Sequence, residues 1–117
     1  MAHLSTHVLD TARGIPAKGL KIELHRIENS TRRRVATGVT NAEGRIAAPL
    51  ISGDLLEIGV YELVFHAGDY LRSTGQHVSE PAFLDQIVVR FGVAEPDRNY
   101  HVPLLLSPFG YTTYRGS

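Results

Sequence analysis

Apolar and polar residues alternate along much of the chain, with the two-residue period of strands that bury one face. The clearest stretch is residues 20–25, where Leu20, Ile22 and Leu24 share one face and polar residues the other. Further stretches are rich in Val, Ile, Tyr and Phe, which favour strands, and they are residues 4–10, 34–40, 59–66, 85–93, 100–106 and 111–115. The pattern predicts seven or eight strands.

Turn-forming residues separate these stretches. Gly, Pro, Asn, Asp or Ser occur at residues 13–16, 28–30, 41–44, 52–54, 95–97 and 107–110. In residues 68–81 we expect a short helix instead, capped by Asp69 and stopped by Gly75. The predicted fold class is all-β, a two-sheet antiparallel β-sandwich of about eight strands with one short helix.

Length and composition fit one domain spanning residues 1–117. The chain is 43% hydrophobic and 21% charged, as is ordinary for a globular protein, and no linker-like tract interrupts it. Twelve basic residues balance twelve acidic ones, so the chain has no broad positive field and we expect no nucleic-acid partner. The longest apolar stretches, such as residues 102–106, are far shorter than the roughly 20 residues of a membrane helix. With no signal-like N-terminal segment, the expectation is a cytoplasmic protein without a membrane partner.

Two features limit the candidate chemistry. The chain has no cysteine, which excludes disulfides, thiolate zinc sites and cysteine nucleophiles. It also has no His-Glu-x-x-His motif, so no metal site is predicted, although His3, His7 and His101 together remain a minor alternative for one. The basic run of residues 32–34 is interpreted as a solvated loop.

Six histidines are the main candidates for acid–base chemistry, because imidazole titrates near neutral pH. The two-residue period places His3, Ser5 and His7 on one face of the first strand, and it places His101 on one face of a late strand. The remaining histidines are interpreted as residues that satisfy local hydrogen bonds or lie in a loop, and they are His25, His66 and His77.

A histidine and an arginine suffice for hydrolysis by activated water. A neutral imidazole can deprotonate a water that attacks a carbonyl, and an arginine can stabilise the resulting oxyanion. Arg45 is a candidate because it follows Gly44 at a turn. A serine triad is disfavoured, because Gly-x-Ser-x-Gly is absent and Ser117 ends the sequence instead of occupying a strand-to-helix elbow.

Several segments resemble the transthyretin-like family. They are Leu-Ser-Thr-His-Val-Leu-Asp at residues 4–10, Gly-Ile-Pro-Ala at 14–17, Thr-Asn-Ala-Glu-Gly-Arg at 40–45, Gly-Val-Tyr-Glu-Leu at 59–63 and Tyr-His-Val-Pro-Leu-Leu-Leu-Ser-Pro at 100–108. The resemblance spans nearly the whole chain. One departure is the segment from residue 68 to Phe83, which is longer than the helix-to-strand connection expected of the family.

This family contains hormone carriers and 5-hydroxyisourate hydrolases, and the final Tyr-Arg-Gly-Ser of residues 114–117 resembles the hydrolases' C-terminal tetrapeptide. The resemblance implies four catalytic residues, and they are His7, Arg45, His101 and Ser117. It implies four substrate-binding residues, and they are His7, Arg45, Tyr114 and Arg115. Either His7 or His101 would be the general base, and Tyr114 would form the floor of a shallow cleft.

The resemblance also implies an assembly and a reaction. The assembly is a homotetramer with substrate clefts at the dimer–dimer interface. The reaction is hydrolytic ring opening of 5-hydroxyisourate to 2-oxo-4-hydroxy-4-carboxy-5-ureidoimidazoline, without a cofactor, in urate catabolism. A small-ligand carrier of the same fold is the first alternative, and a structural or metal-binding tetramer is the second. A carrier needs an open apolar tunnel and no general base.

Overall fold

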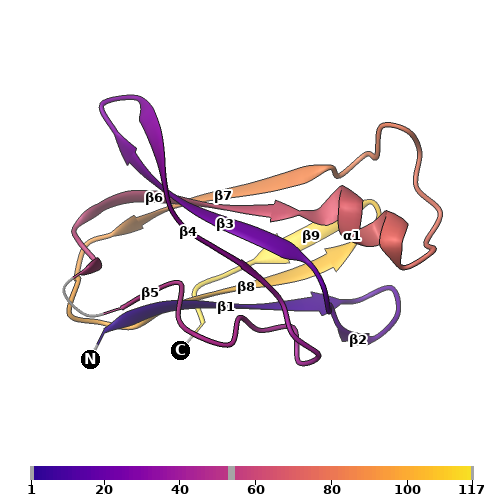
Figure 1. The fold of residues 1–117 in the computed structure, drawn as a ribbon, viewed down its shortest axis with the longest axis horizontal. Coiled ribbons are helices and arrows are strands. Elements are labelled where there is room, and N and C mark those ends of the chain that lie inside the picture. Colours follow the sequence, from indigo (N-terminus) through magenta and orange to yellow (C-terminus); the bar gives the residue numbers. More distant parts are fainter. Residues whose placement is uncertain (1, 53–54, 117) are drawn as a thin grey trace.

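The structure is a computed structural model that describes residues 2–52 and 55–116 (Figure 1). In these residues it contains nine strands and one helix. Their order is β1 (His3–Asp10), β2 (Ile15–Pro16), β3 (Lys21–Glu28), β4 (Thr31–Val39), β5 (Ile51–Ser52), β6 (Gly59–His66), α1 (Ala67–Ser73), β7 (Gln86–Val93), β8 (Tyr100–Ser107) and β9 (Gly110–Thr113). Within the described residues, no helix is long and apolar enough to cross a membrane.

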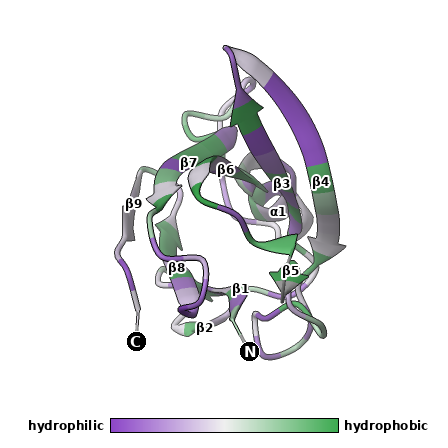
Figure 2. Cartoon of the chain, turned by 90° about the vertical axis from the view of Figure 1, so that its left-hand side faces the viewer, coloured by the Kyte–Doolittle hydropathy of each residue, from purple (hydrophilic) through white to green (hydrophobic). Residues whose placement is uncertain are grey.

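The strands form two sheets that face each other (Figure 2). The first sheet has the order β2-β1-β8-β9, with β5 also paired to β1, and the second has the order β4-β3-β6-β7. All pairings are antiparallel except that of β1 with β8, which is parallel. The predicted β-sandwich with one short helix is therefore confirmed. The sequence pattern did not indicate the parallel pair or the short strands β2 and β5.

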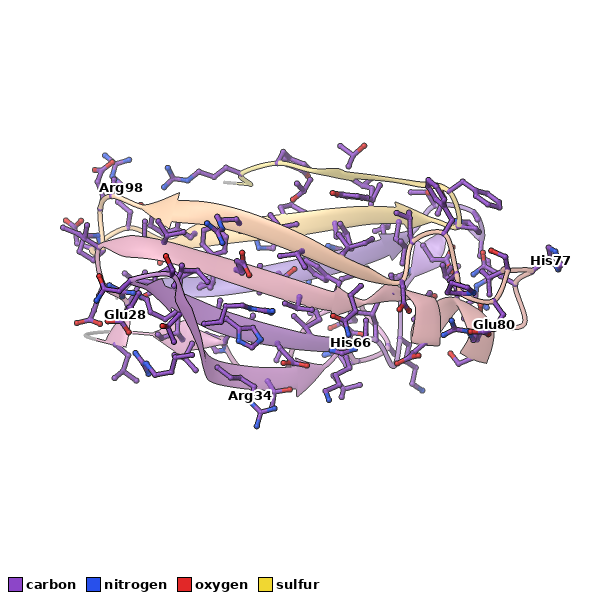
Figure 3. The ribbon with its side chains drawn as sticks, turned by 90° about the horizontal axis from the view of Figure 1, so that it is seen from above. Glu28, Arg34, His66, His77, Glu80 and Arg98 are labelled. Atoms are coloured by element: carbon purple, nitrogen blue, oxygen red, sulfur yellow. The ribbon has the colours of Figure 1, made fainter. Side chains whose placement is uncertain are left out.

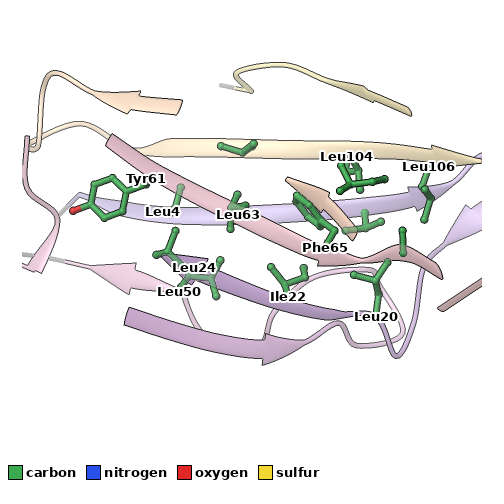
Figure 4. Packing of buried hydrophobic residues seen from close by; sticks show 14 of the residues in the cluster. Leu4, Leu20, Ile22, Leu24, Leu50, Tyr61, Leu63, Phe65, Leu104 and Leu106 are labelled. Atoms are coloured by element: carbon green, nitrogen blue, oxygen red, sulfur yellow. The ribbon is translucent and has the colours of Figure 1, made fainter. Parts of the chain in front are cut away.

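The core lies between the sheets and is built from alternate residues of the long strands other than β4, which contributes only the partly buried Val35 and Ala36 (Figure 4). On β1 every second residue is buried, starting at Leu4, whereas the residues between them are half-buried. The same alternation places Ile22 and Leu24 of β3 against Leu104 and Leu106 of β8, all fully buried. Because the period is two, the buried set fixes which residues of β1 and β8 point outward.

The hairpin between β3 and β4 corrects the prediction for the basic run. Asn29 and Ser30 both have positive φ, at 50° and 68°, which makes a tight two-residue turn whose twist matches the flanking strands. As a result, β4 starts at Thr31, and residues 32–34 are exposed strand residues rather than a loop. Arg33 pairs with Glu28 across the hairpin at 3.3 Å.

The helix starts three residues earlier than predicted, at Ala67 instead of Tyr70. Asp69 lies in its first turn and does not cap it, because α1 begins at Ala67. The amide of Gly68 donates to the carbonyl of Asp85 at 2.8 Å, so the following loop satisfies the helix start. Tyr70 donates from its hydroxyl to the buried carboxylate of Asp10 at 2.8 Å, which docks the helix on the end of β1.

Candidate active site

The parallel pair β1 and β8 places two histidines on one outward face. In its register Ser5 lies opposite His101, and His7 lies opposite Pro103. Paired residues of neighbouring strands point to the same side of a sheet, so His7 and His101 are diagonal neighbours. Both side chains are half-buried. The two-residue period predicted that each histidine lies on one face of its strand. In the structure this face is the outer face of the first sheet.

The other edge of β1 carries three short segments in succession. The strand β2 pairs with its last residues and β5 with its first, while Arg45 forms an antiparallel bridge with His7 between them. The amide of Val8 donates to the carbonyl of Gly44 at 2.9 Å, which fixes this middle segment to the strand. Arg45 is therefore held next to His7 by backbone pairing, and its own side chain is exposed.

Gly44 is what allows this close approach. Its φ is +76°, a conformation that side-chain-bearing residues rarely adopt. A Cβ atom at this position would also collide with the carbonyl oxygen of Val8 and lie 3.2 Å from the Cδ2 atom of His7. The glycine before Arg45 thus lets the turn lie directly on β1.

His101 is surrounded by groups that keep its ring neutral. Burial lowers the pKa of His101 below its ordinary value, and the electrostatic interactions with Arg45 and then with His7 lower this pKa further. Its Nδ1 atom lies 2.9 Å from the hydroxyl of Ser5. At neutral pH the imidazole is thus largely uncharged and can accept a proton.

The C-terminal segment crosses His101 on the other side. The amide of Gly116 donates to the carbonyl of His101 at 2.7 Å, and the two residues form an isolated bridge. Tyr114 and Arg115 line a cavity of about 260 Å³ beside β7, and the Arg115 guanidinium lies 4.2 Å from the ring centroid of Tyr100. Since Tyr100 is buried, Arg115 reaches the inner side of β8, away from the outward histidine face.

The predicted site residues are therefore brought together in part. His7, Arg45 and His101 form one cluster, whereas Tyr114 and Arg115 lie in the tail beside it with the contacts just described. Ser117 lies outside the described residues. Among the described residues, no three His, Cys, Asp or Glu side chains are grouped so that they could hold a metal ion, which argues against the minor alternative of a three-histidine site.

The family model of the HIUase/Transthyretin family matches residues 4–116. The chain belongs to this family. It is 58% identical to a 5-hydroxyisourate hydrolase of Rhizobium meliloti over 97% of this chain and 95% of the relative. Among solved structures, it resembles Klebsiella pneumoniae 5-hydroxyisourate hydrolase with a TM-score of 0.83, 36% identity and full coverage of both chains.

Transthyretins are also similar to this chain in structure. Sea bream transthyretin in complex with thyroxine matches with a TM-score of 0.87 and 32% identity, over 98% of this chain and 95% of that one. The fold alone therefore does not separate the two activities of the family. A hydrolase and a carrier therefore have to be distinguished by the residues on the outer face of the first sheet.

The other histidines have the local contacts that the sequence suggested. His25 and His66 contact the two carboxylate oxygens of Glu23 at 3.0 Å and 2.7 Å, on the outer face of the second sheet. His77 extends from the connection between α1 and β7 at one end of the molecule, while Arg98 lies at the other end (Figure 3). The structure thus separates these three from the His7, Arg45 and His101 cluster.

Sequence reasoning did not assign a role to Ser5 or to Gly116. Ser5 lies between His3 and His7 in the two-residue period, so the sequence already placed it on the same face as these histidines. Its contact with His101 was not, because it depends on the parallel register of β1 and β8. The role of Gly116 likewise depends on a backbone bridge that no sequence pattern reveals.

Proposed function

We propose that this protein hydrolyses 5-hydroxyisourate in urate catabolism, with its active site at His7, Arg45 and His101. The observation that carries this assignment is the convergence of two histidines and an arginine on one outward sheet face. Such a group supplies a base and a cation for an oxyanion, which a carrier does not need. The curated relative from Rhizobium meliloti and the Klebsiella pneumoniae structure, both named 5-hydroxyisourate hydrolases, support the same assignment.

In the proposed reaction His101 is the general base. Its lowered pKa keeps the imidazole neutral, so it can remove a proton from the attacking water. The water oxygen bonds to a carbonyl carbon of the six-membered ring, and Arg45 stabilises the negative charge on the carbonyl oxygen. The carbon–nitrogen bond of the ring then breaks, and the departing nitrogen takes the proton from His101. No step requires an organic cofactor.

The remaining residues would hold the substrate. His7 lies beside Arg45 and would orient the substrate carbonyl together with it. Ser117, Tyr114 and Arg115 are proposed to contact the substrate through hydrogen bonds and stacking. Because Arg115 lies over the ring of Tyr100, its side chain would have to turn toward the histidine face to reach the substrate, while the backbone of Gly116 stays in place.

The test is to generate 5-hydroxyisourate in situ with urate oxidase and to follow its ultraviolet absorbance. The wild-type chain should speed the decay well above the spontaneous rate, whereas His7→Ala, Arg45→Ala, His101→Ala and a chain lacking Ser117 should lose most of the acceleration. His66→Ala is a matched control, because its histidine lies on the other sheet. Spontaneous decay with the wild type would reject the function, and active histidine variants would reject only the site.

We also propose that the protein assembles as a homotetramer with the active sites at the dimer–dimer interface. The strands β7 and β9 are the last strands of the two sheet orders and lie on the same side of the sandwich (Figure 2). Exposed edges of this kind are commonly paired with another chain. Light scattering should give four times the chain mass of 12.9 kDa, and a monomer at micromolar concentration would contradict the assembly.

A carrier of small aromatic ligands is the second candidate, supported by the similarity to sea bream transthyretin in complex with thyroxine. Calorimetric titration with thyroxine distinguishes it from the hydrolase. A carrier should bind in the micromolar range or tighter without affecting 5-hydroxyisourate decay. We expect weak or no binding, because charged and polar side chains occupy the face on which the ligand would rest.

A further inference from the structure

The hydroxyl of Ser5 is the side-chain contact of the His101 ring within the described residues. Its Oγ lies 2.9 Å from Nδ1 of His101, and the two residues are direct partners in the register of β1 and β8. The contact is half-buried, so water competes with it only partly. An imidazole has two nitrogens, and this contact leaves Nε2 as the one available for proton exchange.

On its opposite side, the ring of His101 is contacted by the C-terminal segment at Gly116. A Cβ atom on Gly116 would lie 2.6 Å from Cδ2 of His101 and 3.3 Å from Cγ, so the glycine backbone packs directly against the ring. The hydrogen bond from the Gly116 amide to the His101 carbonyl, at 2.7 Å, keeps this backbone in place. The ring is thus held at Nδ1 by Ser5 and at Cδ2 by Gly116.

On the basis of the function proposed above, we propose that Ser5 is a positioning residue that accepts a hydrogen bond from Nδ1–H of His101. The proton on Nδ1 leaves a lone pair on Nε2, which is the form that can take a proton from water. After that transfer the ring carries a proton on each nitrogen, and Nδ1–H still donates to Ser5. The same hydrogen bond therefore serves the ring before and after the proton moves.

A hydroxyl suits this position better than a carboxylate would. A carboxylate next to Nδ1 stabilises the charged imidazole and raises its pKa, whereas a neutral hydroxyl orients the ring with less effect on charge. His101 lies beside Arg45, and a protonated ring there would be repelled by the guanidinium. In the proposed arrangement Ser5 accepts from Nδ1–H, orients the ring and leaves it neutral.

The test compares four variants in the hydrolysis assay. Ser5→Ala should lower kcat about fivefold to tenfold, the loss of roughly one hydrogen bond, with KM changed less than about twofold. Ser5→Thr keeps the hydroxyl and should retain most activity, while Ser5→Val has the same shape as threonine without the hydroxyl and should behave like Ser5→Ala. Ser107→Ala is the matched control, since its hydroxyl donates to the Gly110 carbonyl in the turn between β8 and β9.

A second measurement does not depend on turnover. Long-range proton–nitrogen NMR distinguishes the two tautomers of a neutral histidine. His101 should carry its proton on Nδ1 in the wild type and in Ser5→Thr, and it should shift toward the Nε2–H form in Ser5→Ala and Ser5→Val. If the wild type fails to hydrolyse 5-hydroxyisourate, the proposed function is rejected. The spectrum still shows whether Ser5 accepts a hydrogen bond from Nδ1–H of His101.

Two outcomes would overturn the role of Ser5. One is wild-type kcat and an unchanged His101 spectrum in both Ser5→Ala and Ser5→Val. The other is a loss of kcat in these variants while the tautomer stays the same, because the effect would then come from packing. Since Ser5→Thr and Ser5→Val match in shape, a folding defect common to both cannot imitate the expected difference between them.

Discussion

The outer faces of the two sheets each carry a pair of histidines, but with different neighbours. On the second sheet His25 and His66 share the carboxylate of Glu23, at 3.0 Å and 2.7 Å. On the first sheet His7 and His101 lie beside the guanidinium of Arg45. A carboxylate stabilises a charged imidazole, whereas a guanidinium opposes it.

We interpret the pair on the second sheet as structural and the pair on the first sheet as the one suited to acid–base chemistry. The hydrogen bond from His66 lowers the pKa of Glu23 most, and the one from His25 adds to it, although burial acts in the opposite direction. The result is a linked group that ties β3 to β6. Burial, Arg45 and His7 instead lower the pKa of His101, which leaves a neutral ring able to accept a proton. The neighbours of a histidine, not its presence, indicate its role.

The largest effect is expected when a carboxylate replaces the guanidinium beside the histidines of the first sheet. Arg45→Glu removes the cation that would stabilise the oxyanion and should lower kcat/KM by about 100- to 1,000-fold. It also removes a charge that lowers the pKa of His101, so this pKa should rise. The acid limb of the pH–rate profile should then move to higher pH, because the base has to be neutral. Arg45→Gln should give the same direction with a smaller shift.

Arg34→Glu is the matched control for this charge reversal. Arg34 is exposed on β4, near the outer face of the second sheet, as Figure 3 shows. Its reversal should leave both the rate and the titration of His101, followed by NMR, at wild-type values. Equal losses in the two variants would mean that net charge, rather than the cluster, governs the activity.

The next largest effect is expected where the tail meets the ring. In Gly116→Ala the new methyl group would lie 2.6 Å from Cδ2 of His101, so the ring or the tail has to move. Displacement of a catalytic group by about 1 Å can lower a rate about 100-fold, and we expect a loss of kcat of this order. The melting temperature should change little, because Gly116 lies outside the core.

Gly110→Ala offers a control on the neighbouring strand. Among the described residues, a Cβ atom there would meet only the hydroxyl of Ser107, at an ordinary contact distance of 3.7 Å. This variant should keep full activity. Wild-type activity in Gly116→Ala would show that the tail does not hold His101 in the working enzyme.

Most of the fold could be predicted from the two-residue alternation. The strand β6 matches its predicted bounds, and β8 differs by a single residue at its end. The hairpin at Asn29 and Ser30 was placed correctly as a turn, but the start of β4 was missed, because three adjacent arginines have no alternation to indicate a strand. The parallel register of β1 with β8 depends on the packing of the whole sandwich and leaves no local signal.

The candidate site was predictable as a set of residues but not as an arrangement. Alternation placed His7 and His101 each on one face of its strand, the turn at Gly44 made Arg45 a candidate, and the family resemblance grouped the three. The bridge between Arg45 and His7 depends on a turn that only Gly44 permits, through its positive φ and the lack of a Cβ atom. Side-chain directions in the tail, such as that of Arg115 over Tyr100, have no periodic pattern behind them.

The smallest effect is expected on the second sheet, where Glu23→Gln tests whether the histidine pair contributes to stability and not to activity. Losing the charged partner of His25 and His66 should lower the free energy of unfolding by about 1 kcal/mol, measured by urea denaturation at one protein concentration. Activity should remain at the wild-type value, since this group is not part of the His7, Arg45 and His101 cluster. Glu28→Gln, which removes an exposed pair with Arg33, should have almost no effect on either property.

The pH dependence of this difference has a defined sign. Because the pKa of Glu23 is lower in the folded state, its charge stabilises the fold above the ordinary carboxyl range, and this stabilisation is lost as the pH falls through the lowered value. The gap in unfolding free energy between the wild type and Glu23→Gln should therefore shrink as the pH falls from the ordinary carboxyl range through the lowered pKa of Glu23. A gap that stays constant over this range would mean that the two histidines hold Glu23 by shape and not by charge.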